Sequence, residues 1–173
     1  MTKLLGVLLF TGIVFAEIKL PDNFSADFTQ MITNTKKKVI TYNGEVRFSE
    51  GKLFKWSYLK PTKKEVCTDG SELLVVDHDL EQVSAYYISE GLDIAKVLGK
   101  AKLHSKNIYV AQYQGKKYTI QLDDTQKLHS IAYYDDLDNK VQIVFPSMKY
   151  GKGKLATQKM KCDYPTEYDM IRG

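Results

Sequence analysis

Apolar and polar residues alternate with a period of two along much of this chain, which is typical of β-strands with one buried face. The clearest run is LFKWSYLK, in which Phe54, Trp56 and Tyr58 share one face. Pro61 follows and should end this strand, because proline has no N–H to donate to a sheet. The pattern therefore predicts a sheet whose buried face is unusually rich in aromatic side chains.

Short turns separate about eleven such runs, and several contain residues that favour chain reversal, such as Asp69-Gly70 and Gln114-Gly115. Asn43-Gly44 lies inside a run and predicts a β-bulge. Strands this short and regularly spaced indicate a closed or curled antiparallel sheet. The expected strands cover residues 24–34, 38–49, 52–60, 63–68, 71–77, 81–88, 107–114, 116–123, 128–135, 139–149 and 159–164.

One segment, residues 89–103, breaks the alternation. Leu92, Val97 and Leu98 fall near helical spacing, and a Ser or Asp near the start of the segment can cap a helix. We therefore expect one short amphipathic helix that covers an open end of the sheet.

Residues 1–16, MTKLLGVLLFTGIVFA, have the pattern of a secretory signal peptide, which leaves residues 17–173 as a single domain. The alternative is an uncleaved membrane anchor, but the apolar run is short for a span of about 20 residues. Glu17 follows the expected cut, whereas a lipid-anchored protein would need a cysteine there. Removing residues 1–16 lowers the formal net charge only from +4 to +3, so a nucleic-acid partner is not expected.

Motifs for catalysis are not found in the sequence. The three histidines are scattered, and we interpret Asp77-His78-Asp79 as a solvated hairpin turn. An enzyme, a cofactor and a metal site are therefore not expected. Cys67 and Cys162 form either a disulfide, as is common in exported proteins, or two separate buried thiols.

Three sequence features together resemble one known family. They are L-F-x-W followed by Pro, D-G and D-x-x-x-x-Q-V within residues 53–83; F-x-A-x-F-x-Q at residues 24–30; and a tail from Tyr164-Pro165 to Ile171. In this order they resemble the periplasmic outer-membrane lipoprotein carrier family, LolA. The resemblance implies a mainly β fold, an incomplete antiparallel barrel of about eleven strands with a short helical lid.

The chain departs from that family in two places. Residues 17–23 are too few for the helix that usually precedes the first strand, since isolated helices need roughly 12–15 residues. Family members often have an arginine before L-F-x-W that latches the lid, whereas this chain has Lys52, which lacks the planar fork of arginine.

Eleven strands with one helix should leave a cavity, because barrels of more than about eight strands have room for a ligand. The alternative is an interior filled by side chains. The candidate ligand-binding residues come from the apolar faces and the helix. They are Phe28, Val46, Phe48, Phe54, Trp56, Tyr58, Leu92, Val97, Leu98, Ile120, Leu122, Ile143 and Phe145.

The resemblance implies a monomeric periplasmic carrier that binds the acyl chains of lipoproteins released from the inner membrane and delivers them to the outer membrane. Its implied partners are acylated lipoproteins, an inner-membrane ABC-type releasing complex and a candidate outer-membrane receptor. Two alternatives stay open: a carrier of free lipid or isoprenoid, and an envelope adaptor that binds no ligand.

Overall fold

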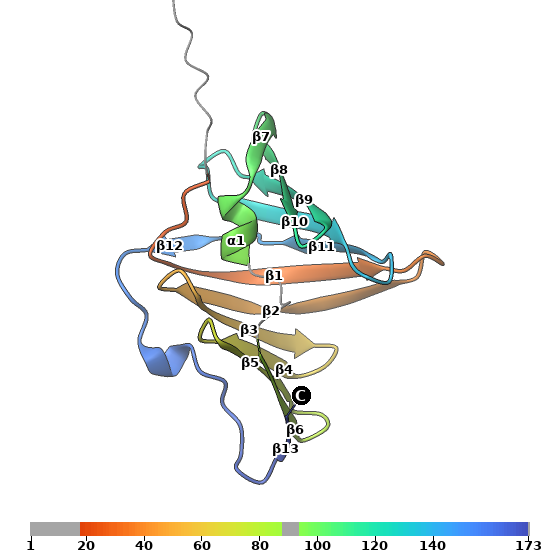
Figure 1. Cartoon of the computed structure of the whole chain (residues 1–173), viewed down its shortest axis with the longest axis vertical. Helices are drawn as coiled ribbons and strands as arrows, with labels where there is room; N and C mark the ends of the chain where they lie inside the picture. Colours follow the sequence, from red (N-terminus) through yellow and green to blue (C-terminus); the bar gives the residue numbers. More distant parts are fainter. Residues whose placement is uncertain (1–17, 88–93, 173) are drawn as a thin grey trace, which may run out of the picture.

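A computed structural model describes residues 18–87 and 94–172 of the chain (Figure 1). The expected signal peptide, the expected mature start at Glu17 and the candidate lid residue Leu92 lie outside these residues. Within them the protein is mainly β, as the alternating pattern predicts, with a single short α-helix.

In the described part of the chain, thirteen strands belong to one sheet. They are β1 (Asn23–Thr33), β2 (Val39–Ser49), β3 (Leu53–Lys60), β4 (Lys64–Thr68), β5 (Glu72–Asp77), β6 (Gln82–Tyr87), β7 (Lys102–Ser105), β8 (Ile108–Tyr113), β9 (Lys116–Leu122), β10 (Leu128–Tyr134), β11 (Lys140–Val144), β12 (Lys149–Gly151) and β13 (Asp169–Arg172). The α-helix is α1 (Ile94–Gly99), and a 3₁₀-helix is η1 (Thr157–Lys159). Among the described residues neither helix has the length and apolar character needed to cross a membrane.

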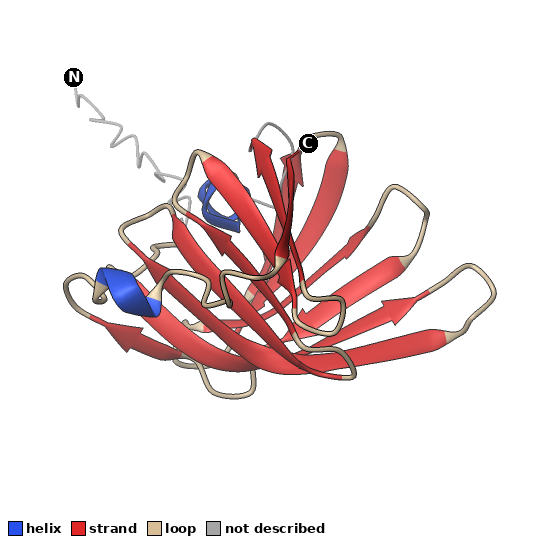
Figure 2. Cartoon of the chain, turned by 90° about the horizontal axis from the view of Figure 1, so that it is seen from below, coloured by secondary structure: helices blue, strands red, loops and turns tan. Residues whose placement is uncertain are grey.

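The strand order is β13-β6-β5-β4-β3-β2-β1-β11-β10-β9-β8-β7, and β12 pairs with β1 off this path. Figure 2 shows the sheet curling into an open trough, with α1 at its open side. The two end strands, β13 and β7, are not paired with each other among the described residues, so the barrel is incomplete as expected. Neighbouring strands are antiparallel except β13, which pairs with β6 in parallel.

Two expected strands need correction near the C-terminus. The run 139–149 divides into β11 and β12, because Pro146 lies between them and cannot donate to a ladder. The expected strand at 159–164 is wrong. Its first residue belongs to η1, and the rest of that segment is held against the sheet by side chains and a disulfide instead of a strand ladder.

The helix is also shorter than expected, since α1 ends at Gly99 and residues 102–105 form β7. All four side chains of β7 are exposed, and so are all four of β13. A strand exposed on both faces has no apolar alternation, and the sequence pattern therefore misses both.

Phenylalanines fill one half of the trough. The ring of Phe48 stacks on that of Phe24 at 4.9 Å between centroids, and it packs against Phe54 at 4.8 Å. All three side chains are buried, because they alternate in phase on β1, β2 and β3 and face the inside of the curve.

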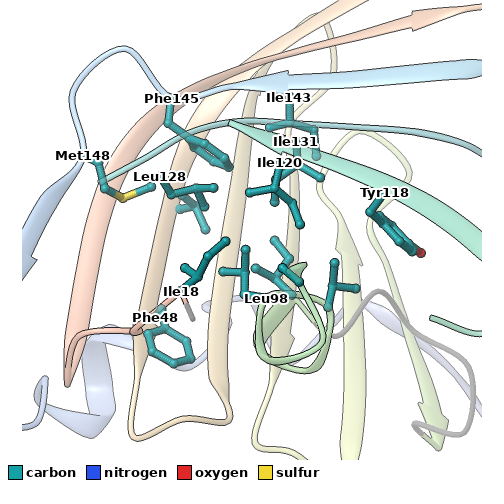
Figure 3. Packing of buried hydrophobic residues seen from close by; sticks show 14 of the residues in the cluster. Ile18, Phe48, Leu98, Tyr118, Ile120, Leu128, Ile131, Ile143, Phe145 and Met148 are labelled. Atoms are coloured by element: carbon teal, nitrogen blue, oxygen red, sulfur yellow. The ribbon is translucent and has the colours of Figure 1, made fainter. Parts of the chain in front are cut away.

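Branched aliphatic side chains fill the other half, where β9, β10 and β11 face the helix. Ile120 and Ile131 are fully buried, and Figure 3 shows Leu98 of α1 lying toward them. The helix thus contributes to the main hydrophobic cluster. Ile18, ahead of β1, joins the same cluster although the described chain forms no helix there.

The bulge expected at Asn43-Gly44 is confirmed in the β2–β3 ladder. Asn43 pairs with Lys60 and Gly44 pairs with Tyr58, so one residue of β3 is left without a partner. Glycine is required here by space, because a Cβ at Gly44 would clash with the backbone carbonyl oxygen of Ser57 and lie 2.9 Å from ring carbons of Phe28.

A second, smaller apolar layer lies on the outer face of the sheet. Val76 and Val83 are fully buried there, and they are not part of the main hydrophobic cluster that contains the phenylalanines. The C-terminal segment that follows β12 covers this face and ends beside β6 as β13 (Figure 1). The segment is fixed by a disulfide between Cys67 and Cys162, whose Cα atoms are 5.7 Å apart.

Candidate functional site

A cavity of about 640 Å³ opens on the inner face of the sheet. Its walls come from β1, β3, β4, β5, β10 and β11, and the helix contributes Ala95 and Lys96. The lining residues are Gln30, Gly51, Lys52, Phe54, Trp56, Tyr58, Val66, Thr68, Gly70, Leu73, Ala95, Lys96, Tyr133 and Ile143.

The aromatic run of β3 forms one wall of this cavity. Phe54, Trp56 and Tyr58 all line it, because a period of two places them on the same face. Phe28 supports this wall from β1, with its ring centroid 4.9 Å from Trp56 and 5.1 Å from Tyr58 in edge-to-face contacts. Phe145 also contacts Trp56, at 6.2 Å.

Strands β4 and β5 extend the apolar wall beyond β3. Val66 pairs with Trp56 across the β3–β4 ladder, and Leu73 follows on β5 opposite Thr68. These residues were not among the predicted set. The alternation within β4 and β5 is a signal that could have found them, since it puts Val66 and Leu73 in phase with the aromatic face.

Helix α1 serves two purposes at this site. Its buried side chains, which include Val97 and Leu98, lie in the hydrophobic cluster. Ala95 and Lys96 line the cavity instead. The helix is therefore anchored by one face and closes part of the cavity with another.

Lys52 lies at the end of the cavity near the β4–β5 turn. Its aliphatic stem packs over Gly70, where a Cβ would come within 3.0 Å of the Lys52 Cδ atom. Gly70 has a φ of +94°, a conformation that favours glycine, so this turn brings backbone and lysine stem close together. The ammonium group belongs to an exposed side chain.

The cavity is not wholly apolar, because Gln30, Tyr58 and Tyr133 also line it. Burial raises the pKa of the Tyr58 hydroxyl to about 12, and the nearby Tyr42 adds to this rise. Burial also raises the pKa of Tyr133, with smaller contributions from Tyr118 and Tyr58. Both phenols therefore stay protonated at neutral pH and can donate hydrogen bonds.

The structure brings four of the predicted ligand-binding residues to the cavity wall, namely Phe54, Trp56, Tyr58 and Ile143. Leu92 lies outside the described residues. The others are buried in the cluster that surrounds the cavity: Phe28, Val46, Phe48, Val97, Leu98, Ile120, Leu122 and Phe145.

The outer face carries a different set of polar contacts. Lys55, which alternates with the aromatic residues, pairs with Glu65 at 3.0 Å and donates a hydrogen bond to the Lys161 carbonyl at 2.8 Å. The Asp163 N–H donates to Glu65 at 2.9 Å. With the disulfide, these contacts hold the C-terminal segment on the side of the sheet opposite the cavity.

The Asp77-His78-Asp79 segment is a turn between β5 and β6. One oxygen of the Asp77 carboxylate accepts hydrogen bonds from the backbone N–H groups of Asp79 and Leu80, and the other pairs with Lys64 at 2.9 Å. His78 lies 3.3 Å from the Tyr168 hydroxyl. These contacts fix a turn and the C-terminal segment, and they lie away from the cavity lining.

The fold and the cavity together define an open β-barrel with a hollow, largely apolar interior under a short helix. Two solved structures share this fold. An uncharacterized conserved protein from Thermus thermophilus superposes with a TM-score of 0.58 at 13% identity, over 89% of this chain and 92% of that one. A LolA superfamily protein from Nitrosomonas europaea gives 0.52 at 12% identity, over 86% and 94%.

Sequence comparison identifies the family. Residues 21–132 match the family model described as outer membrane lipoprotein carrier protein LolA. The outer-membrane lipoprotein carrier protein of Campylobacter jejuni is 32% identical over 164 residues, which cover 95% of both chains. That of Wolinella succinogenes is 28% identical over 136 residues, or 79% of each. This chain belongs to the LolA family.

Proposed function

We propose that this chain is a non-enzymatic carrier that encloses the acyl chains of lipoproteins in its cavity while they cross the periplasm. The observation that carries this proposal is an aromatic cavity of about 640 Å³ in a member of a lipoprotein carrier family. Each methylene moved from water into such a site contributes about 0.8 kcal/mol. Acyl chains are therefore far more stable in the cavity than in the aqueous space between two membranes.

The route of the cargo follows from the same proposal. The carrier accepts lipoproteins from an inner-membrane ABC-type complex and delivers them to the outer membrane, either directly or through a receptor. Export through the signal peptide at residues 1–16 places it in the periplasm. In this proposal the carrier acts as a monomer.

Movement of α1 is the step that admits cargo in this proposal. Ala95 and Lys96 face the cavity, so displacing the helix widens it. The buried side chains of α1 limit that displacement, because moving them exposes apolar surface. Loading thus requires the cargo to replace the contacts that the helix gives up.

Trp56 provides the direct test, because it lines the cavity and is the single tryptophan of the chain. Titrating the purified mature protein with a synthetic triacylated lipopeptide should shift Trp56 emission to the blue and protect it from an aqueous quencher. The same peptide without acyl chains is the control and should have no effect. An unchanged spectrum with the acylated peptide would refute the proposal.

The alternative function, a carrier of free lipid, is distinguished by the molecules that copurify with the protein from the periplasm. Mass spectrometry of the protein purified without detergent should find acylated lipoprotein. Free phospholipid or isoprenoid alone, with no response to the lipopeptide, would favour a free-lipid carrier. An adaptor with a filled interior would bind neither.

A further inference from the structure

Four uncharged polar side chains interrupt the apolar wall of the cavity, and one of them, Thr68, accepts a hydrogen bond from the Gly70 N–H. The Gln30 side chain is only 9% exposed, and it lines the cavity together with Tyr58 and Tyr133. Within residues 18–87 and 94–172, neither the Gln30 amide nor the hydroxyls of these two tyrosines make a hydrogen bond to the protein. Among the described residues no fully buried side-chain N or O atom lacks a partner, so the polar atoms of these three residues reach the cavity space, where a ligand can meet them.

The strand register explains why Gln30 points inward. It alternates in phase with Phe24, Ala26 and Phe28 on β1, all of which are buried on the inner face. Its cross-strand neighbour on β11 is Ile143, which also lines the cavity. Once a ligand displaces water from the cavity, an amide left without a partner costs free energy that leucine or methionine at the same position would avoid.

The two tyrosines come from opposite sides of Gln30. Tyr58 belongs to β3, two strands away through β2, and Tyr133 belongs to β10, two strands away through β11. Both tyrosines line the same cavity, and Tyr58 makes a small contribution to the raised pKa of Tyr133. A ligand that fills the cavity can therefore reach the Gln30 amide and the tyrosine hydroxyls.

The chemistry of these groups limits what they can bind. An amide and two protonated phenols donate hydrogen bonds without formal charge, and they match a neutral acceptor. The cation Lys52 lines the cavity beside Phe54, four residues from Tyr58 along β3, or roughly 13 Å at 3.3 Å per residue. A ligand carboxylate would be drawn toward that lysine, whereas an ester or amide carbonyl suits the uncharged donors.

We propose that Gln30, Tyr58 and Tyr133 form a subsite for the carbonyl groups of ester- or amide-linked acyl chains. This inference rests on the proposed carrier function and adds a source of selectivity to it. The hydrocarbon wall cannot tell one saturated chain from another, but the polar subsite favours chains that bring an acceptor to this depth. Without the acceptor, the three donors stay unpaired.

The test compares two ligands of equal chain length. One is a diacylglyceryl lipopeptide with ester linkages, and the other is its dialkyl ether analogue, which lacks the carbonyl acceptors. Binding to the mature protein is measured by Trp56 fluorescence and by calorimetry. We expect the ester to bind about three- to tenfold more tightly, the range of one or two net hydrogen bonds.

Variants then locate the effect. Gln30→Met removes the amide with little change in volume, and the ester preference should fall toward about onefold as its donor is lost. Tyr133→Phe is a second variant that removes one hydroxyl and keeps the ring, and it should reduce the preference in part. Val66→Ala is the matched control on the apolar wall. It should weaken both ligands alike and leave their ratio unchanged.

Each outcome decides between the possibilities. Equal affinity for ester and ether in the unmodified protein, or a preference that survives in both Gln30→Met and Tyr133→Phe, would overturn the subsite while the carrier function stands. Failure of the unmodified protein to bind either ligand would instead refute the carrier function. A free fatty acid that depends on Gln30 more than the ester does would show that the groups bind a carboxylate.

Discussion

At the scale of single residues, the shape of the aromatic wall depends on the glycine at position 44, which has no side chain. Gly44 lies opposite Phe28 in the β1–β2 ladder and opposite Tyr58 in the β2–β3 ladder. The Phe28 ring occupies the space that a Cβ at Gly44 would need, and from there it supports both Trp56 and Tyr58.

Gly44→Ala should therefore crowd both the Ser57 carbonyl oxygen and the Phe28 ring, and destabilise the protein by about 1–3 kcal/mol, the usual range for overpacking. Denaturant unfolding followed by circular dichroism measures the change. Gly99→Ala is the control, because no atom lies within 4 Å of its added Cβ, and it should alter stability by less than about 0.5 kcal/mol. Equal effects of the two substitutions would contradict the role given to Phe28.

Asp69 organises the β4–β5 hairpin through its carboxylate. The Ser71 hydroxyl donates to one oxygen of the carboxylate at 2.7 Å, and the N–H groups of Ser71 and Glu72 donate to it at 2.9 Å and 3.1 Å. These hydrogen bonds, led by the Ser71 hydroxyl, lower the pKa of Asp69 to about 2.

A lowered pKa means that the charged carboxylate stabilises the folded state above the unfolded pKa near 3.9. That contribution is lost as the pH falls through about 2. Asp69→Asn should thus be less stable than the unmodified protein at pH 7, and the difference should shrink between about pH 4 and pH 2. Urea unfolding across this range measures it. Ser71→Ala, which removes the hydroxyl that donates to Asp69 at 2.7 Å, should show part of the same effect.

Individual residues also show how much of the candidate site could be predicted from the sequence. The aromatic alternation of β3 was enough to predict Phe54, Trp56 and Tyr58 on one face. Gln30 carried an equally clear signal, since it follows Phe28 in phase, but a polar residue was not counted as part of an apolar wall. Tyr133 depended on the β1–β11 pairing, which no local pattern reveals.

At the scale of elements, α1 contributes side chains both to the hydrophobic cluster and to the cavity wall. The segment was predicted as a lid whose apolar residues touch the ligand, and the structure places Val97 and Leu98 in the hydrophobic cluster. Helical spacing shows that a side chain is buried, but it does not show whether protein or ligand surrounds it. Strands β7 and β13 were not predicted, because their side chains are all exposed and show no alternation of apolar and polar residues.

The two faces of α1 should respond differently to substitution. Leu98→Ala should lower the free energy of unfolding by about 2–5 kcal/mol, because it leaves a space in a fully buried position. Ala95→Phe should instead fill part of the cavity and weaken binding of the triacylated lipopeptide by about tenfold, with little loss of stability. Thermal unfolding and Trp56 titration measure the pair. Loss of stability in Ala95→Phe as large as in Leu98→Ala would show that α1 has no separate cavity face.

At the scale of the whole molecule, the sheet is covered on both sides by different means. The helix covers part of the inner face, where the cavity lies, whereas the C-terminal segment covers the outer face of β3 to β6. The disulfide that fixes this segment joins residues 95 apart in the chain. Sequence alone left Cys67 and Cys162 open between a bridge and two thiols, because their distance depends on the path of the whole chain.

Replacing both cysteines by alanine should destabilise the protein by about 3–5 kcal/mol, since a long closed loop restricts the unfolded chain strongly. Lipopeptide binding should change by less than about twofold, because Cys67 lies on the face opposite the cavity and distant sites act independently. Guanidinium unfolding with and without a reductant measures the first effect, and reductant should have no influence on the double variant. A large loss of binding would mean that the two faces are coupled.

The central place of β1 has a consequence for the order in which the protein is built. This strand pairs with β2 soon after it emerges, but its other edge waits for β11, where Thr29 meets Val144. Contacts between distant parts of a chain form late, because the intervening loop must close first. The meander from β1 to β6 can therefore assemble early with its aromatic wall uncovered, while Tyr133 and Ile143 arrive only near completion. A nascent chain has no enclosed apolar compartment, and cargo can be captured only by the finished molecule.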